Sequence, residues 1–300
     1  MDVELFIKRR KQLGYSQVAL SKGICTQSTL SKFEKDSQVP SLAILTRLCN
    51  RLGLTIDDLT RRDASSARYI RDTLDQVEEG LMIENFPQVS AGLNKLKIDQ
   101  IMANKEKMRY FYLEGFNYVL TNQESSEILF SFTQILDELD ERHQTIYSYL
   151  AYLGLGIYYT RHDSMERASF FFTKVTNYLK TLVNQMEDTG PHEDDLRVLA
   201  ITYYLAEYQA LIGKLKESNH LIHQGVRICA RKHVTYFLPR LKVLEAQNAL
   251  DQGGDPQEIA NLLNDALAFA RLNRNNVVQV QVAALKKNYR KVVSQLTKQR

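Results

Sequence analysis

The fold of this chain is decided by residues 10–54, which read RKQLGYSQVALSKGICTQSTLSKFEKDSQVPSLAILTRLCNRLGL. Short apolar segments alternate with glycines and with hydroxyl residues at positions where a helix can begin. Ser16 and Thr26 are suited to cap helices, because their hydroxyl groups accept hydrogen bonds from the unpaired N–H groups of a first helical turn. Glycine can end a helix because it readily adopts the left-handed backbone conformation. The pattern predicts a compact unit of five short helices, over residues 3–13, 17–22, 27–35, 42–52 and 55–59.

The apolar residues of this first unit are spaced so that one face of each predicted helix can share a single core. The expected core residues are Leu5, Leu13, Val18, Leu20, Ile24, Leu30, Phe33, Leu42, Leu45, Leu48, Leu52, Ile56 and Leu59. The side chains left outside on helix 27–35 are mostly short polar groups followed by lysines. Such groups can hydrogen-bond to the edges of DNA bases and pair with phosphates. The residues expected to contact DNA are Gln17, Thr26, Gln27, Ser28, Thr29, Ser31, Lys32 and Lys35.

The quoted stretch closely resembles the helix-turn-helix of the phage-repressor-like (XRE) regulators. The resemblance is greatest to the peptide-pheromone receptors of the PlcR type, where a GICxQSxxSxxE…PSxxIL pattern recurs, and the chain thus resembles the PlcR/Rgg-like (RRNPP) regulators. It implies that residues 17–22 form the second helix and residues 27–35 the recognition helix. It also implies a buried ion pair between Arg10 and Glu34. The residues that it places on DNA are Gln17, at a phosphate, and Gln27, Ser28 and Lys32, at bases.

The modest net charge of +4 is the sum of three blocks that differ in sign. Residues 1–62 hold eleven Lys and Arg against six Asp and Glu, and residues 63–265 hold twenty against twenty-nine. Residues 266–300 hold eight Lys and Arg and no acid. The basic first block suits a polyanionic partner, and the acidic middle does not. We therefore expect a DNA-binding domain over residues 1–62 and a second domain over residues 67–300.

Composition indicates a mostly helical cytoplasmic protein. The chain has only five prolines and thirteen glycines in 300 residues, fewer than average. No apolar run approaches the roughly 20 residues that a membrane span needs, and the first residues lack the apolar segment of a secretory signal. Three scattered cysteines fit a reducing compartment without a disulfide framework. No membrane partner is expected.

Residues 67–300 contain a repeated helical hairpin with a period near 34 residues. The clearest copy is 152–180, where Gly156, Ala168 and Phe172 follow the spacing of the tetratricopeptide (TPR) repeat. The expected fold class is all-α, with the five-helix domain followed by a right-handed TPR-like solenoid of about five hairpins and a C-terminal capping helix. Segment 186–195 is expected to be an exposed loop. The other repeat copies are 69–98, 107–139, 196–230 and 238–270, and the capping helix is 277–296.

The concave face of such a solenoid is built from the first helix of each pair. Aromatic and charged side chains there suit an extended peptide, although the aromatic residues can equally belong to the core of the repeats. Several relatives hold the peptide backbone with asparagines, and this chain has Gly154 and Tyr204 near two of those positions. That departure leaves the ligand open. The candidate peptide-binding residues are Arg109, Tyr112, Phe116, Arg161, Tyr203, Tyr204, Glu207, Glu245 and Asn248.

The sequence contains no catalytic constellation and no cofactor motif, so we expect a protein that is not an enzyme and has no cofactor. His220 and His223 have the spacing of two metal ligands on one helix, but no second cluster completes a shell. Surface histidines are the simpler interpretation, and no metal is expected. Cys25 precedes the recognition helix and either packs against the core or acts as a redox switch.

The expected function is sequence-specific regulation of transcription. The resemblance implies a homodimer on a two-fold operator in double-stranded DNA, and a short signalling peptide that binds the concave face in quorum sensing and alters the dimer. Two alternatives stay open. One is a repressor controlled by a protein partner in the same groove. The other is a repeat protein that sequesters or dephosphorylates a response regulator. The basic C-terminal helix is interpreted as a cap, with a second DNA contact as the alternative.

Overall fold

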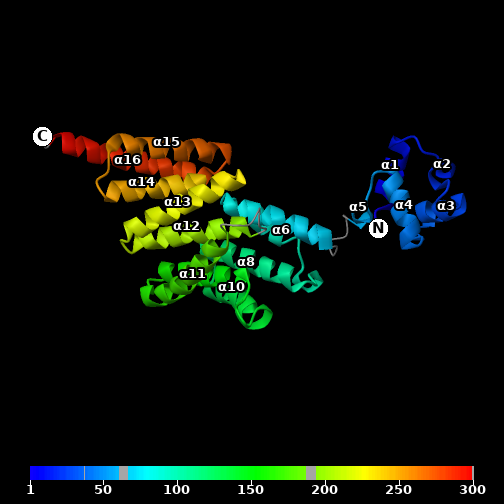
Figure 1. Cartoon of the computed structure of the whole chain (residues 1–300), viewed down its shortest axis with the longest axis horizontal. Coiled ribbons are helices and arrows are strands. Elements are labelled where there is room, and N and C mark those ends of the chain that lie inside the picture. The colour runs from blue at the N-terminus through cyan, green and yellow to red at the C-terminus, as the bar shows by residue number, and fades with distance from the viewer. Residues whose placement is uncertain (37, 61–66, 187–193, 299–300) are drawn as a thin grey trace. The chain divides into compact units, whose positions relative to one another are not determined.

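The computed structural model describes residues 1–36, 38–60, 67–186 and 194–298, which fold into helices joined by short connections (Figure 1). No β-strand occurs in these ranges, which confirms the all-α fold class. Contacts divide the chain into two compact units. The first comprises residues 1–75 and 94–106, and the second comprises residues 76–93 and 107–300. Helices α6 (Ala67–Met82) and α8 (Asn104–Leu120) therefore each carry residues of both units.

The first five helices form where the sequence pattern predicts them. The predicted caps are in place: Ser16 Oγ accepts a hydrogen bond from Ala19 N at 3.0 Å, and Thr26 Oγ1 accepts one from Thr29 N at 3.1 Å. The glycines that follow α1, α2 and α4 all have a positive φ, a conformation that is costly for other residues. The helices are α1 (Val3–Gln12), α2 (Gln17–Ser21), α3 (Gln27–Asp36), α4 (Leu42–Arg51) and α5 (Ile56–Thr60).

The core of these five helices contains most of the expected residues and adds Phe6 of α1, which was not among them. Phe6 is fully buried and packs edge-on against Phe33, with 5.1 Å between the ring centroids. Leu13, which is expected in the core, lies just beyond the end of α1 and is exposed. Val18 and Leu42 are exposed in the first turns of their helices, so these three core predictions are wrong.

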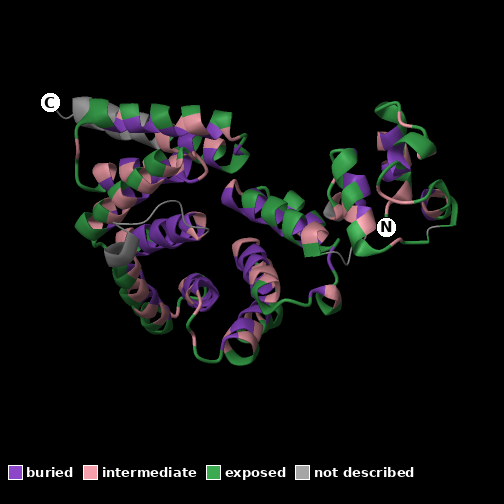
Figure 2. Cartoon of the chain, turned by 45° about the vertical axis from the view of Figure 1, so that its right-hand side comes forward, coloured by how far each residue is buried: buried purple, intermediate pink, exposed green. Residues whose placement is uncertain are grey.

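The second unit is a series of helical hairpins in the predicted order (Figure 1). Buried residues line the sides on which the helices pack (Figure 2). The last helix, α16 (Asn276–Lys298), packs against α14 and α15 as the expected cap. The 3₁₀ turn Ile98–Gln100 belongs to the first unit. The hairpins of the second unit are α6 with α7 (Phe86–Leu93), α8 with α9 (Ser125–Thr133) and the π-turn Gln134–Leu139, α10 (Ile146–Arg161) with α11 (Met165–Met186), α12 (Asp195–Leu211) with α13 (Leu215–Lys232), and α14 (Leu238–Asp251) with α15 (Pro256–Leu272).

Glycines inside the hairpins mark places where an aromatic ring lies directly against a helix backbone. The ring of Phe132 is fully buried, and a Cβ placed on Gly115 of α8 or Gly154 of α10 would lie 2.6 or 2.1 Å from it. Phe172 lies over Gly156 in the same manner, at 3.0 Å. The small residues of the repeat pattern are therefore required by packing, because interiors leave no room for an added methyl group.

Replacing Gly154 by alanine should lower the free energy of unfolding by about 2 kcal/mol, because overpacking a filled core forces side chains from their preferred rotamers. Gly80 of α6 is a matched control, since its added Cβ would lie 3.3 Å from Val89 Cγ2 and needs only a small adjustment. Urea denaturation of the full chain followed by circular dichroism measures both. Equal stability of the Gly154→Ala and Gly80→Ala variants would contradict the packing described here.

Parts of three predicted features lie outside the described residues. These are the polar segment between the domains at 61–66, the loop at 187–193, and the end of the basic tail at 299–300, with the side chains of 288–298. Within the described ranges, no helix is both long enough and apolar enough to cross a membrane.

Candidate functional sites

The first candidate site is the outer surface of α3. Thr26, Gln27, Ser28, Lys32 and Lys35 are exposed, and the remaining two predicted residues of this helix, Thr29 and Ser31, are half-buried. The opposite face of α3 carries Leu30 and Phe33 into the core. One helix thus presents amide, hydroxyl and ammonium groups together on a surface that solvent can reach.

A chain of polar contacts connects the inside of the first unit to this surface. Arg10 Nε and Nη2 donate to the two carboxylate oxygens of Glu34 at 2.7 and 2.9 Å, and both side chains are at most 10% exposed. This confirms the buried ion pair that the resemblance implied. Gln17 Nε2 donates to Glu34 Oε2 at 2.8 Å, and Gln27 Nε2 donates to Gln17 Oε1 at 2.8 Å. The ion pair therefore orients Gln17, and Gln17 orients Gln27.

The contact between Gln17 and Gln27 was not anticipated from the sequence. Gln17 is half-buried, and its side chain is directed at Glu34 and Gln27 in this structure. Thr26 Oγ1 lies 2.8 Å from Thr29 Oγ1 in addition to capping α3, so these two residues are also held within the protein. Gln27, Ser28, Lys32 and Lys35 remain as the most available donors and acceptors of the surface.

Two arginines of α4 have a structural role that their charge does not suggest. Arg47 Nη2 donates to the Gly23 carbonyl at 2.8 Å. Arg51 Nη1 donates to the carbonyls of Leu20 and Lys22 at 2.9 and 2.6 Å. These carbonyls lie at the end of α2 and in the turn that follows, where a helix has unpaired acceptors. The arginines therefore fix the turn that sets α2 against α3.

The second candidate site is a pocket of about 390 Å³ in the second unit, lined by α10, α12 and neighbouring helices. It brings together four of the nine residues predicted to bind a peptide: Arg161, Tyr203, Tyr204 and Glu207. Tyr203 Oη donates to Glu207 Oε1 at 3.1 Å, and Arg161 Nη1 donates to the Val119 carbonyl at 2.6 Å. The pocket therefore offers aromatic rings beside groups of both charges.

Arg240 is a lining residue that sequence analysis did not identify. Its side chain is 4% exposed, and its guanidinium lies over the rings of Phe237 and Tyr203, 4.2 and 4.7 Å from their centroids. Its Nη1 donates to Tyr204 Oη at 3.2 Å and lies 3.5 Å from Glu84 Oε1. The only signal for it in the sequence was Phe237, three positions before Arg240, because residues three apart on a helix lie side by side and a ring can then pack against an arginine.

Glu207 is exposed as a residue, but many protein groups lie close to its carboxylate. Loss of hydration raises its pKa, and the Tyr203 hydroxyl and the Arg240 charge oppose that rise. The carboxylate keeps one oxygen for a bound group, since Tyr203 donates to Oε1 alone. A ligand with an amide N–H or an ammonium group has a suitable acceptor here.

The other five predicted peptide-binding residues have partners within the protein. Arg109 pairs with the buried Glu78, which also receives Arg197 Nε at 2.8 Å. Glu245 accepts from Lys242 on its own helix at 2.9 Å. The buried Asn248 donates to Ser218 and Asn219. Tyr112 and Phe116 are also buried, with ring centroids 5.0 Å apart, and Phe116 packs against Tyr204.

The two positions where relatives are expected to have asparagine are explained by packing. Gly154 faces the ring of Phe132, which leaves no room for a side chain. Tyr204 is buried, and its hydroxyl accepts from Arg240. Neither position can supply an asparagine-like amide to a ligand in this structure.

The histidine and cysteine side chains considered as metal ligands do not lie together in one site. His220 and His223 are exposed, whereas Cys229 is buried. No group of three potential metal ligands occurs among the residues that the structure describes. Cys25 packs against the core of the first unit, and burial raises the pKa of its thiol. The thiolate form is thereby disfavoured, which supports a packing role over a redox role.

Residues 7–59 match the helix-turn-helix family, with α2 and α3 inside the matched range. No curated protein matches the chain in sequence. The chain is similar in structure to PlcR of Bacillus thuringiensis, solved in complex with the peptide PapR7 and DNA. Identity is 17%, the TM-score is 0.57, and the similarity covers 96% of this chain and 98% of PlcR.

A second similar structure is ComR of S. thermophilus, solved in complex with DNA and its signalling peptide ComS. Identity is 16%, the TM-score is 0.56, and the similarity covers 96% of this chain and 99% of ComR. The apo form of ComR from Streptococcus vestibularis is similar at 17% identity and a TM-score of 0.50, with 96% and 98% covered. The chain therefore has a helix-turn-helix domain at residues 7–59 and shares its overall fold with PlcR and ComR.

Proposed function

We propose that this protein is a transcriptional regulator that binds a specific DNA sequence through α3. The observation that carries the proposal is the oriented Gln27 on the exposed face of α3 within a helix-turn-helix match. An α-helix fits the major groove, where glutamine can bind adenine through two hydrogen bonds and lysine can bind guanine or phosphate. Ser28 and Lys32 supply further contacts to bases, and Lys35 supplies one to phosphate.

The active form is proposed to be a homodimer on a two-fold operator. One helix reads only a few base pairs, so a single copy gives little discrimination between sequences. Two copies related by two-fold symmetry double the sequence that is read and fix the spacing of the half-sites.

The pocket formed by Arg161, Tyr203, Tyr204 and Glu207 is proposed to bind a short peptide. Support comes from its chemistry, because rings suit apolar side chains and the charged groups suit termini and backbone amides. The peptides in the PlcR and ComR structures give a precedent on the same fold. To regulate DNA binding, the peptide must bind one arrangement of the dimer more tightly than another.

Replacing Glu207 by glutamine should weaken peptide binding about tenfold, because a charge-assisted hydrogen bond becomes a neutral one. The peptides are selected from a synthetic library of five- to ten-residue sequences by retention on the full-length protein, and affinity is measured by calorimetry. Glu245→Gln is the matched control, since Glu245 pairs with Lys242 and does not line the pocket. Its effect should stay within twofold.

The peptide proposal fails if the wild-type protein retains no library peptide, or if the Glu245→Gln and Glu207→Gln variants lose affinity equally. A protein that retains no peptide but binds selected DNA would keep the first proposal and lose the second.

A further inference from the structure

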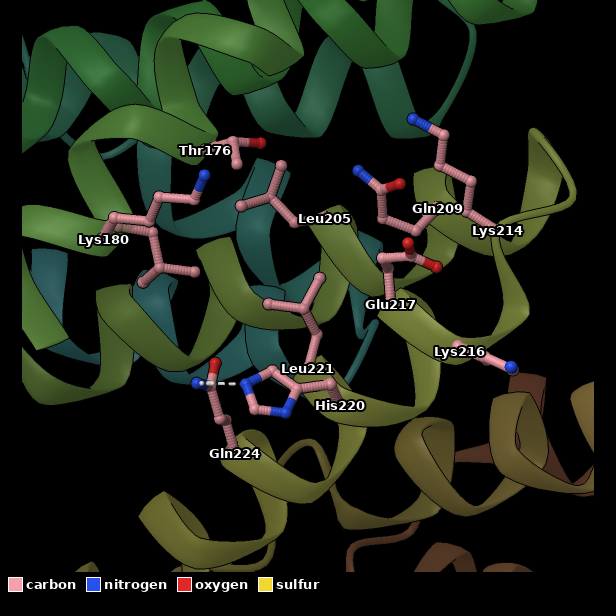
Figure 3. A pocket seen from close by; sticks show the side chains of 11 residues that line it. Thr176, Lys180, Leu205, Gln209, Lys214, Lys216, Glu217, His220, Leu221 and Gln224 are labelled. Atoms are coloured by element: carbon pink, nitrogen blue, oxygen red, sulfur yellow. Dashed lines mark hydrogen bonds between the residues drawn. The ribbon is translucent and has the colours of Figure 1, made fainter.

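A second pocket lies on the other side of α12 and is larger than the proposed peptide pocket. It has a volume of about 740 Å³ and is lined by α11, α12, the turn before α13, and α13 itself. Three leucines are among its lining residues, one from each helix: Leu221 is half-buried, and Leu179 and Leu205 are almost fully buried. Figure 3 shows Leu205 and Leu221 in the pocket. Pockets of roughly 300–1,000 Å³ with mostly apolar walls and a few polar groups are typical of small-molecule sites.

The charged groups of this pocket are mostly cationic. Lys180, Lys214 and Lys216 are exposed, and within the described part of the chain none of their ammonium groups has an ion pair or a hydrogen bond. Glu217 is the only acid among the lining residues. Figure 3 shows Lys180 and Lys214 at opposite sides of the pocket, with Leu205 between them.

The two pockets differ in whether their cationic side chains have partners within the protein. In the proposed peptide pocket, Arg161 binds backbone carbonyls and Arg240 is held by Tyr204 and Glu84. Among the described residues, the ammonium groups of the outer pocket have no such partners, although the repeat region is acidic overall. Unpaired cations beside apolar surface favour a ligand that supplies negative charge and an apolar body together.

We propose that the outer pocket binds an amphiphilic anion, with an apolar chain against the half-buried Leu221 and over the buried Leu179 and Leu205, and with an anionic head at the lysine rim. Lys214 directly precedes α13, whose N-terminus adds positive potential at the same side. Lysine binds anions as a point charge, so carboxylate and phosphate heads share this recognition.

The two pockets share helices α11 and α12 in their walls. Leu205 and Gln209 of α12 line the outer pocket, and Tyr204 and Tyr208 of the same helix line the proposed peptide pocket. A ligand that shifts α12 acts on both pockets, which provides a physical route for coupling.

The test uses the full-length protein with dodecanoate below its micelle concentration, and with dodecyl phosphate as the second source of the anionic head. Dodecyltrimethylammonium is the matched cation with the same chain. Methyl NMR of the leucines locates the bound chain. Shifts are expected at Leu179, Leu205 and Leu221, and not at Leu120 and Leu211 of the peptide pocket. Both anions should bind, and the cation should bind at least tenfold more weakly.

The Lys180→Glu/Lys214→Glu variant should lose at least tenfold in affinity for dodecanoate. Its matched control is Arg227→Glu/Arg231→Glu, which changes net charge equally at exposed positions of α13 outside the pocket. The control should stay within twofold. The proposal is overturned if neither anion binds, if the cation binds as well as the anions, if the shifts map to the peptide pocket, or if both double variants lose affinity equally.

Discussion

Replacing Glu34 by alanine is expected to destabilise the helix-turn-helix domain by about 3–5 kcal/mol, the range for breaking a buried ion pair. Arg10 would stay buried with its charge uncompensated, because its two bonds to Glu34 are lost and only the Tyr15 carbonyl remains as an acceptor. Gln17 would lose its anchor at the same time. Hydrogen exchange of peptides from residues 3–36, measured by mass spectrometry as urea rises, reports on this domain within the full chain.

The control is Asp36→Ala, which removes an exposed acid from the same helix. Its effect should be below about 0.5 kcal/mol, as for most surface substitutions. Replacing the pair together by Arg10→Met and Glu34→Leu should restore most of the stability, since an apolar pair of similar volume avoids the desolvation cost. If Glu34→Ala and Asp36→Ala open the domain at the same urea concentration, the ion pair does not support the domain.

The helices of the first unit could be predicted because their signals are local. A hydroxyl cap, a glycine with positive φ and the turn that follows a helix each depend only on residues a few positions away in the sequence. The hairpins of the repeat could be predicted for a related reason. A large ring on one helix needs a small residue on its neighbour, and Gly156 beside Phe172 shows this pairing.

Residue burial was harder to predict wherever two faces of a helix look alike. On α1, the adjacent residues Leu5 and Phe6 both suit a core, and the contact with Phe33 on α3 makes Phe6 the fully buried one while Leu5 is half-buried. Tyr112 and Phe116 pose the same problem in the repeat. Aromatic residues on the concave face and aromatic residues in the core have the same spacing in the sequence. The structure buries both.

The candidate sites show a similar division. The exposed donors of α3 followed from one helix alone. The bond between Gln17 and Gln27 joins two helices, and it depends on the crossing that Arg47 and Arg51 fix. Arg240 was missed because a lone arginine on a helix usually lies at the surface, whereas here three aromatic rings surround it.

Replacing Gln27 and Ser28 together by alanine is expected to lower affinity for the operator about 100-fold, or roughly 3 kcal/mol. Each well-paired base contact contributes about 1–3 kcal/mol of discrimination, and a dimer loses the contacts in both half-sites. Neither side chain is buried, and α3 keeps its cap, so the domain should stay folded. Binding to random DNA should be nearly unchanged, because that binding comes from phosphate contacts.

The Lys35→Ala variant is the matched control for this change. Loss of a phosphate contact should weaken binding to all sequences alike and should reduce the dependence of affinity on salt concentration. The two variants therefore separate the reading of bases from general attraction to DNA.

The central claim, that α3 reads DNA sequence, is tested most directly by the specificity ratio. An operator is first selected from random DNA with the wild-type protein, and dissociation constants for operator and random DNA are then measured at one salt concentration. We predict that Gln27→Ala/Ser28→Ala lowers the ratio about 100-fold, while Lys35→Ala leaves it within twofold. A ratio unchanged by Gln27→Ala/Ser28→Ala, or a wild-type protein that selects no sequence, would contradict the claim.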